Sequence, residues 1–201
     1  MGSSTTSSQG VEISFLKNFM NIIKYERPSA KFQEFREQGP VIFLAGPTVR
    51  GNQPHLTSWR IQAVEEFRIR NFKGTLILPE FEDKFKSDQF RYDLPAWEFA
   101  GLEAADVIMF WIPRTRELIG LTTNFELGYW LGREPLKVTY GRPDDAYRIK
   151  YCDLMWEIEN IRSKTGAERE IMNKLDDLVF DSMHIAESNY RYRTGNYESH
   201  N

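Results

Sequence analysis

The chain has 201 residues, a formal net charge of −3 and 41% hydrophobic residues, values that fit one folded domain with a substantial core. The slight negative charge gives no footprint for nucleic-acid polymers, and no apolar run approaches the roughly 18 residues of a membrane-spanning helix. The single cysteine, Cys152, excludes an internal disulfide framework and favours a reducing compartment, so we expect a cytoplasmic protein.

The first half of the chain alternates predicted helices and strands. Residues 1–10 are rich in Ser, Thr and Gly without the apolar core of a signal peptide, which indicates a disordered tail or a cloning remnant. Residues 11–25 carry apolar side chains at helical spacing and predict an N-terminal helix. A continuous apolar run predicts a buried strand over 41–45. A helix is predicted over 58–70 and a second strand over 75–78.

The second half continues the alternation. Residues 81–94 lack a clear period and predict a loop. We then expect a helix over 95–105, a strand over 106–112, a loop over 114–123 and a helix over 124–132. A strand over 135–140 and helices over 146–162 and 167–183 complete the prediction. The polar residues 189–201 predict a flexible tail, which leaves 11–188 as a single domain.

Strands that alternate with helices, and are too continuously apolar for burial on one side, predict a doubly wound parallel sheet of about five strands. We expect an N-terminal helix and a C-terminal helical extension around it. Right-handed crossovers place the turns after Leu44, Leu78, Ile112 and Tyr140 at one edge of the sheet. Ligands of such sheets bind at this edge, so these turns are the first place to look for a site.

A turn of small residues directly follows the first predicted buried strand. A backbone with little side chain allows a sugar or phosphate to approach closely, and an arginine adds a fork of donors for an anionic oxygen. The alternative for the arginine is an ordinary surface position. The candidate binding residues here are Ala45, Gly46, Pro47, Thr48, Arg50 and Gly51.

Two glutamates are candidates for chemistry at the same edge. Glu126 is predicted in the first turn of a helix, where the helix dipole favours an ionised carboxylate that can attack a sugar carbon. Glu98 lies on the helix before the third predicted buried strand, and two carboxylates that converge on one cleft suit nucleophile-plus-acid cleavage of a glycosidic bond. The alternative is that Glu126 only supports its own helix and that Glu98 is a solvated surface charge.

Other chemistry finds less support. His55, His184 and His200 share no metal-ligand spacing with Cys152, and we expect neither a metal nor a cofactor. A Walker loop and a Gly-x-Gly-x-x-Gly fingerprint are both missing, which disfavours a P-loop enzyme or a usual dinucleotide dehydrogenase.

The ordered set Phe43-Leu44-Ala45-Gly46-Pro47, Glu98 to Asp106 and Thr123-Asn124-Phe125-Glu126-Leu127-Gly128 resembles the nucleoside 2-deoxyribosyltransferase family, which includes deoxynucleoside-monophosphate N-glycosidases. The similarity covers about residues 41–143. It implies a flavodoxin-like (Rossmann-like) fold and a homodimer or larger homo-oligomer.

The resemblance also implies roles for individual residues. Glu126 corresponds to the glutamate that attacks C1′ of a 2′-deoxynucleoside and forms a covalent glycosyl-enzyme, which a second base or water then releases. Glu98 stands where the family has an aspartate that handles protons at the base. The first-strand turn frames the sugar, with Thr48, Arg50 and Gly51 suited to a phosphate. Further expected substrate contacts are Phe43, Asp93, Thr123 and Asn124.

Two positions depart from the family pattern. A tyrosine common in its first strand is Phe43 here, and an aspartate that holds the sugar is Gly120. These differences keep open the hypothesis of a non-catalytic nucleotide-binding or sensor module. A further alternative is a glycohydrolase that uses the same two carboxylates to cleave the nicotinamide bond of a dinucleotide.

Overall fold

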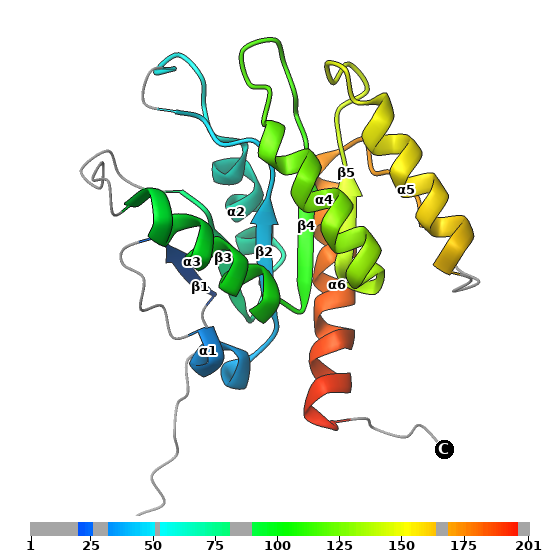
Figure 1. Ribbon diagram of the computed structural model, residues 1–201. Coiled ribbons are helices and arrows are strands. Elements are labelled where there is room, and N and C mark those ends of the chain that lie inside the picture. The colour runs from blue at the N-terminus through cyan, green and yellow to red at the C-terminus, as the bar shows by residue number, and fades with distance from the viewer. Residues whose placement is uncertain (1–19, 26–31, 51–52, 81–89, 164–168, 197–201) are drawn as a thin grey trace, which may run out of the picture.

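The computed structural model describes residues 20–25, 32–50, 53–80, 90–163 and 169–196. Within these residues, five strands form an all-parallel sheet in the order β1-β3-β2-β4-β5 (Figure 1). The predicted α/β class and the parallel sheet are therefore confirmed. The strands are β1 Asn21–Lys24, β2 Val41–Ala45, β3 Thr75–Leu78, β4 Val107–Trp111 and β5 Val138–Gly141.

Helices cover both faces of this sheet (Figure 1). Their bounds are α1 Phe32–Gln38, α2 Trp59–Ile69, α3 Phe90–Ala104, α4 Leu121–Arg133, α5 Lys150–Ser163 and α6 Leu175–Thr194. Buried side chains of α1, α3, α4 and α5 pack on one face, and those of α2 and α6 pack on the other. None of the helices in the described part of the chain has the length and apolar character needed to cross a bilayer.

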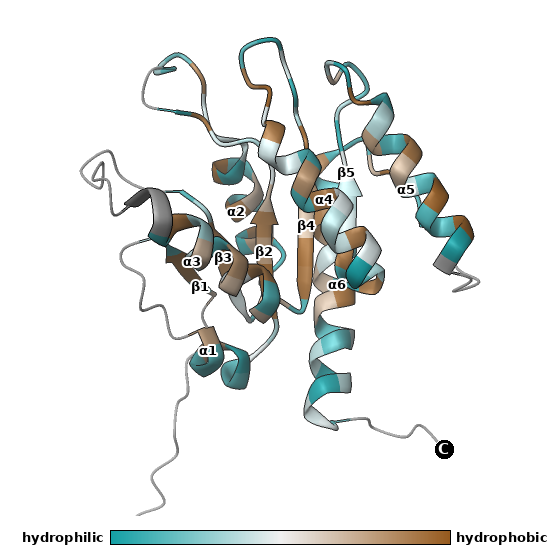
Figure 2. Ribbon diagram, in the orientation of Figure 1, coloured by the Kyte–Doolittle hydropathy of each residue, from teal (hydrophilic) through white to brown (hydrophobic). Residues whose placement is uncertain are grey.

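The central strands are buried on both sides because their side chains alternate between two cores. In β2, Val41 and Phe43 join the core under α3 and α4, whereas Ile42 and Leu44 join the core under α2 and α6. All five β2 residues are buried, and Figure 2 shows β2 and β4 as hydrophobic throughout. Leu178 and Val179 of α6 are fully buried in the second core, so the C-terminal helix is an integral part of the fold.

The strand order places a topological switch point between β2 and β4. The chain leaves β2 through α2 on one face and turns towards β3, whereas it leaves β4 through α4 on the other face and turns towards β5. Loops that diverge in this way open a crevice at the carboxyl ends of the strands. The fold therefore positions a candidate ligand site between residues 46–50 and 53–58 on one side and residues 112–120 on the other.

The N-terminal helix predicted over 11–25 is wrong where the structure describes it. Asn21–Lys24 form β1, an edge strand that pairs in parallel with β3. The adjacent residues Ile22 and Ile23 fit a helical stripe and a short strand equally well, and β-branched side chains favour the strand. Residues 11–19 lie outside the described part of the chain.

Other element boundaries also differ from the prediction. The helix predicted from residue 95 begins at Phe90, because Pro95 lies inside α3 rather than at its start. The helix predicted from residue 124 begins at Leu121, so three residues assigned to a loop are helical. Pro135–Lys137 form a short 3-10 helix ahead of β5. The tail predicted from residue 189 is wrong as far as Thr194, because α6 continues to that residue.

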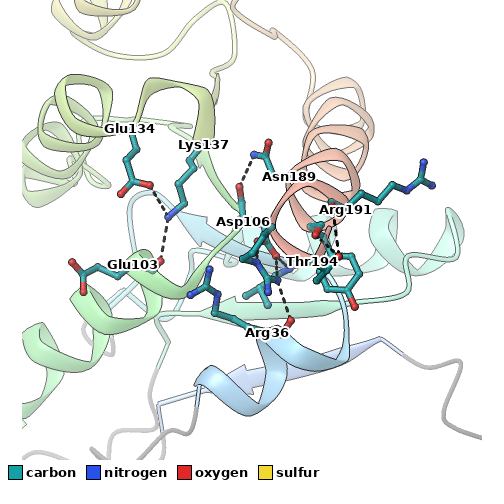
Figure 3. Close-up of polar contacts among 11 residues, drawn as sticks. Arg36, Glu103, Asp106, Glu134, Lys137, Asn189, Arg191 and Thr194 are labelled. Carbon is teal, nitrogen blue, oxygen red and sulfur yellow. Dashed lines mark hydrogen bonds and ion pairs between the residues drawn. The ribbon is translucent and has the colours of Figure 1, made fainter. Parts of the chain in front are cut away.

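A partly buried ion pair at the opposite edge of the sheet explains this longer helix. Asp106, which precedes β4, accepts hydrogen bonds from Arg193 Nε at 2.8 Å and from the backbone N–H of Val41 at 2.9 Å. Asn189 of α6 donates to the Asp106 carbonyl at 2.9 Å, and Arg193 also donates to the Arg36 carbonyl at 3.0 Å (Figure 3). The end of α6 is thus tied to β2, β4 and α1, far from the ligand edge.

Candidate active site

A cavity of about 360 Å³ lies at the switch point. Its wall is built from the end of β2 and the turn that follows, from α3, from the loop after β4 and from the start of α4. The predicted site residues that line it are Phe43, Ala45, Gly46, Pro47, Thr48, Arg50, Glu98, Thr123 and Glu126. The structure therefore brings most of the candidate residues together at the predicted edge of the sheet.

The turn after β2 is shaped by a close approach to β4. Gly46 has a φ of 150°, and a Cβ added to it would lie 2.2 Å from the carbonyl oxygen of Trp111. Only glycine allows two backbones to approach in this way. The indole N–H of Trp59 donates to the Pro47 carbonyl at 3.0 Å and fixes the next residue of the turn. These contacts fix the backbone of the turn after β2, and the missing side chain of Gly46 leaves that backbone open to the cavity.

We expect Gly46→Ala to lower the free energy of unfolding by about 3 kcal/mol, because the new methyl group meets backbone atoms that cannot rotate away. Urea unfolding followed by circular dichroism measures this loss. Gly132→Ala in α4 is the matched control: its Cβ meets nothing within 4 Å, so the same substitution should stabilise the helix by up to about 1 kcal/mol. Equal stability changes in the two variants would contradict this account of the turn.

Glu126 reaches the cavity from the second turn of α4. The prediction of a first-turn position is wrong because the helix begins at Leu121. Thr123, one helical turn earlier, lines the cavity beside it, since residues three apart share a face of a helix. Leu127 and Trp130 point into the core and fix the rotation of the helix.

Glu98 faces the same cavity from α3, on the other side of the β2 end. Its neighbour Trp97 is buried and contacts the Tyr25 ring at a centroid distance of 5.5 Å, so the core anchors this part of the helix. Gly101, one turn later, lets α3 approach Phe43 closely, because an added Cβ would lie 3.0 Å from that ring. The side chain of Glu98 is consequently held over the end of β2.

The two carboxylates titrate differently because their surroundings differ. Burial and then the nearby charge of Glu126 raise the pKa of Glu98 to about 7, against a smaller opposing effect of Arg60. Burial also raises the pKa of Glu126, and the positive charge of Arg60 opposes this rise. Burial therefore opposes the ionisation that we expect for Glu126 from its place near a helix start. Of the pair, Glu126 ionises first and Glu98 retains its proton towards neutral pH.

The loop after β4 forms another wall of the cavity. Gln53 donates to the Glu117 carbonyl at 2.7 Å, and His55 Nε2 lies 2.7 Å from a Glu117 carboxylate oxygen. Gly120 ends the loop in the left-handed region, with a φ of 58°. A Cβ on Gly120 would lie 2.7 Å from Pro47 Cγ, so the turn after β2 occupies the space that a side chain would need.

Two of the predicted binding residues that the structure describes, Asn124 and Asp93, do not line this cavity. Asn124 lies two positions before Glu126 and so faces away from it. It accepts hydrogen bonds from Arg114 and from the thiol of Cys152, and lines a second cavity of about 320 Å³ between α4 and α5. Asp93, in α3, is not part of the cavity wall. Gly51 lies outside the residues that the structure describes.

Arg60, next to the cavity, is one residue that the sequence did not lead us to predict, as are Gln53 and Glu117 in the cavity wall. Arg60 is fully buried beneath the turn after β2, where its Nε donates to the Leu44 carbonyl at 2.9 Å and its Nη2 donates to the Gly46 carbonyl at 2.8 Å. The sequence contains a signal for its burial, because Arg60 lies on the same helix face as the buried apolar residues Ala63, Val64 and Phe67. A charge within such a series indicates a buried ionic site.

A parallel α/β sheet with a cavity at its switch point defines a broad class of ligand-binding α/β domains, and comparison with known proteins narrows that class. The model of the family described as "Nucleoside 2-deoxyribosyltransferase like" matches residues 39–143, more than half of the chain. The chain belongs to this family. Membership points to chemistry at the N-glycosidic bond of nucleosides. A search of the curated proteins found no significant match.

Proposed function

We propose that the protein cleaves the N-glycosidic bond of a nucleoside or nucleotide, with a 2′-deoxy sugar, through a covalent glycosyl–Glu126 intermediate. The observation that carries this proposal is the convergence of Glu98 and Glu126, from different helices, on one cavity. Paired carboxylates with separated pKa values divide naturally into a nucleophile and an acid.

The proposed first step is attack of the ionised Glu126 carboxylate on C1′ while the C1′–N bond to the base breaks. The bonding electrons leave with the base, which takes a proton from the Glu98 carboxyl group. The transition state resembles an oxocarbenium ion, and the negative charge of Glu126 stabilises it. A pKa of about 7 leaves Glu98 largely protonated in slightly acidic solution, as this step requires.

In the second step an acceptor displaces Glu126 from C1′. The acceptor is either the nitrogen of another base or water, and the ionised Glu98 takes up its proton, which restores both carboxyl groups. Transfer occurs when a second base occupies the part of the cavity that the first base has left, and hydrolysis occurs when water occupies it. The resemblance places a sugar-contacting aspartate of the family at Gly120, where an added Cβ would lie 2.7 Å from Pro47 Cγ.

Polar groups at the cavity mouth support a nucleotide as well as a nucleoside. Arg50 is exposed there, with Thr48 and Gln53 in the same wall. A guanidinium and short polar side chains suit the oxygens of a phosphate. The expected homodimer or larger assembly stays a prediction. Large apolar side chains exposed on α4 and α5, including Phe125 and Tyr151, offer a surface that an assembly can bury.

A screen of deoxynucleosides and their 5′-monophosphates for released base tests the proposal. Mass spectrometry should detect free base with at least one substrate, and a second free base added to the mixture should yield a new nucleoside if the enzyme is a transferase. Glu126→Gln protein is the blank. Thermal stabilisation by nucleotides without any released base would contradict the proposal and favour the sensor hypothesis. Release of nicotinamide from a dinucleotide would instead favour the glycohydrolase hypothesis.

A further inference from the structure

Arg60 lies completely buried beneath the cavity, in the first turn of α2. Besides its bonds to the Leu44 and Gly46 carbonyls, its Nη1 donates to Thr48 Oγ1 at 3.2 Å and to the Pro47 carbonyl at 3.4 Å. All four acceptors belong to the end of β2 or the turn after it. One guanidinium therefore holds the backbone that frames the candidate substrate position.

An arginine costs free energy to bury at this place. A buried cation loses its hydration, and the first turn of a helix is where the helix dipole disfavours positive charge. The nearest acid, Glu80 at the end of β3, lies 3.6 Å from Nη1, and its side chain is 20% exposed. Burial lowers the pKa of Arg60 to about 10, so the group stays charged at neutral pH.

The charges around Arg60 come from three elements. Glu80 follows β3, Glu98 belongs to α3 and Glu126 belongs to α4, and each of these carboxylates favours the charged form of Arg60. Arg60 in turn lowers the pKa of both Glu98 and Glu126 against the effect of burial. Within the described residues, the cavity wall carries two further charged side chains, Arg50 and Glu117.

We propose that Arg60 is a positioning residue that acts on the reaction from below the cavity: its hydrogen bonds fix the β2–α2 turn, and its buried guanidinium places a positive charge behind the wall of the cavity that Glu98 and Glu126 line. This inference rests on the proposed function of Glu126. Arg60 itself touches no substrate in this scheme. Its hydrogen bonds supply the geometry, and its charge supplies the ionised nucleophile.

Substitutions that separate charge from geometry test this role. Arg60→Gln removes the charge, so the acid limb of the pH profile of kcat/KM should move to higher pH by about one unit or more. Arg60→Lys keeps the charge but loses most of the carbonyl hydrogen bonds. Its acid limb should stay near that of the natural protein while its unfolding midpoint falls.

Glu80→Gln provides a second test that leaves the buried guanidinium in place. The amide still accepts a hydrogen bond from Ser58, which contacts Glu80 in the structure. With the competing carboxylate gone, Arg60 acts more strongly on Glu126, and the acid limb should move to lower pH. The opposite directions expected for Arg60→Gln and Glu80→Gln cannot both arise from a general loss of stability.

The titration of Glu126 can also be followed without turnover, by 13C NMR of protein labelled at its glutamate carboxyl carbons and assigned with Glu126→Gln. An unshifted Glu126 titration in folded Arg60→Gln, or equal shifts in the lysine and glutamine variants, would overturn the role of Arg60. If Arg60→Gln does not fold, an unshifted titration in Glu80→Gln overturns it instead. Failure of the proposed function is a different result: activity that survives Glu126→Gln, whatever the NMR shows.

Discussion

Glu126→Gln should lower kcat/KM for base release by at least about 10³-fold while leaving the fold intact, because an amide cannot form the glycosyl ester. The amide has the shape of the carboxylate, so the packing of α4 against the core through Leu127 and Trp130 should persist. Steady-state assays with the best substrate of the screen measure the loss, and circular dichroism reports the fold.

Glu134→Gln is the matched control, since it removes a carboxylate at the far end of the same helix, where Glu134 pairs with Lys137. It should change kcat/KM by less than about threefold, in line with the small effects of surface ion pairs. Activity of Glu126→Gln within tenfold of the natural protein would remove Glu126 from the mechanism.

Glu98→Gln should reduce kcat by about 10²-fold or more, because the leaving base no longer receives a proton. The loss should be smaller for substrates with an activated leaving group, which departs without protonation. The basic limb of the pH profile, near pH 7 in the natural protein, should also disappear in this variant. An unchanged basic limb would show that another group supplies the proton.

The same substitution should change how stability depends on pH. The folded protein raises the pKa of Glu98 from 4.5 to about 7, so between these values the folded state binds more protons than the unfolded state. The stability that Glu98 contributes is present below pH 4.5 and is lost as pH rises through about 7. A pKa shift of this size changes the free energy of unfolding by on the order of 3 kcal/mol.

Urea unfolding at pH 5 and pH 8 measures the effect. The natural protein should lose stability between these values, and Glu98→Gln should lose clearly less and be the more stable protein at pH 8. Glu103→Gln, an exposed carboxylate on the same helix, controls for the loss of a negative charge. Parallel losses in the natural protein and in Glu98→Gln would contradict the burial of Glu98 as the cause.

The sequence was sufficient to predict the sheet edge at which the carboxylates meet. Strands such as β2 and β4 are apolar over their whole length, and parallel topology then brings the residues that follow them to one side. The position of Glu126 follows from this argument, and that of Glu98 from the expectation that the start of the helix before β4 faces the same edge. Their different titration does not, because it depends on burial and on Arg60, which strand order cannot reveal.

The failures have identifiable physical causes. The resemblance predicts Asn124 as a substrate contact from its place in the same motif as Glu126, yet two residues along a helix point to nearly opposite sides. Pro95 was taken for a helix start, although α3 carries it in its interior. The edge strand β1 was read as helix because four residues are too few to distinguish the two periods.

The central claim, a covalent bond between Glu126 and C1′, is tested most directly by trapping it. A 2′-fluoro-2′-deoxynucleoside is the probe. Its fluorine disfavours the oxocarbenium-like transition state and slows both the formation and the release of the glycosyl-enzyme, so that the covalent intermediate accumulates. Peptide mass spectrometry should find the fluorinated sugar on the peptide that contains Glu126, and no such adduct in Glu126→Gln. A sugar adduct on any other residue, or one that persists undiminished in Glu126→Gln, would contradict the account.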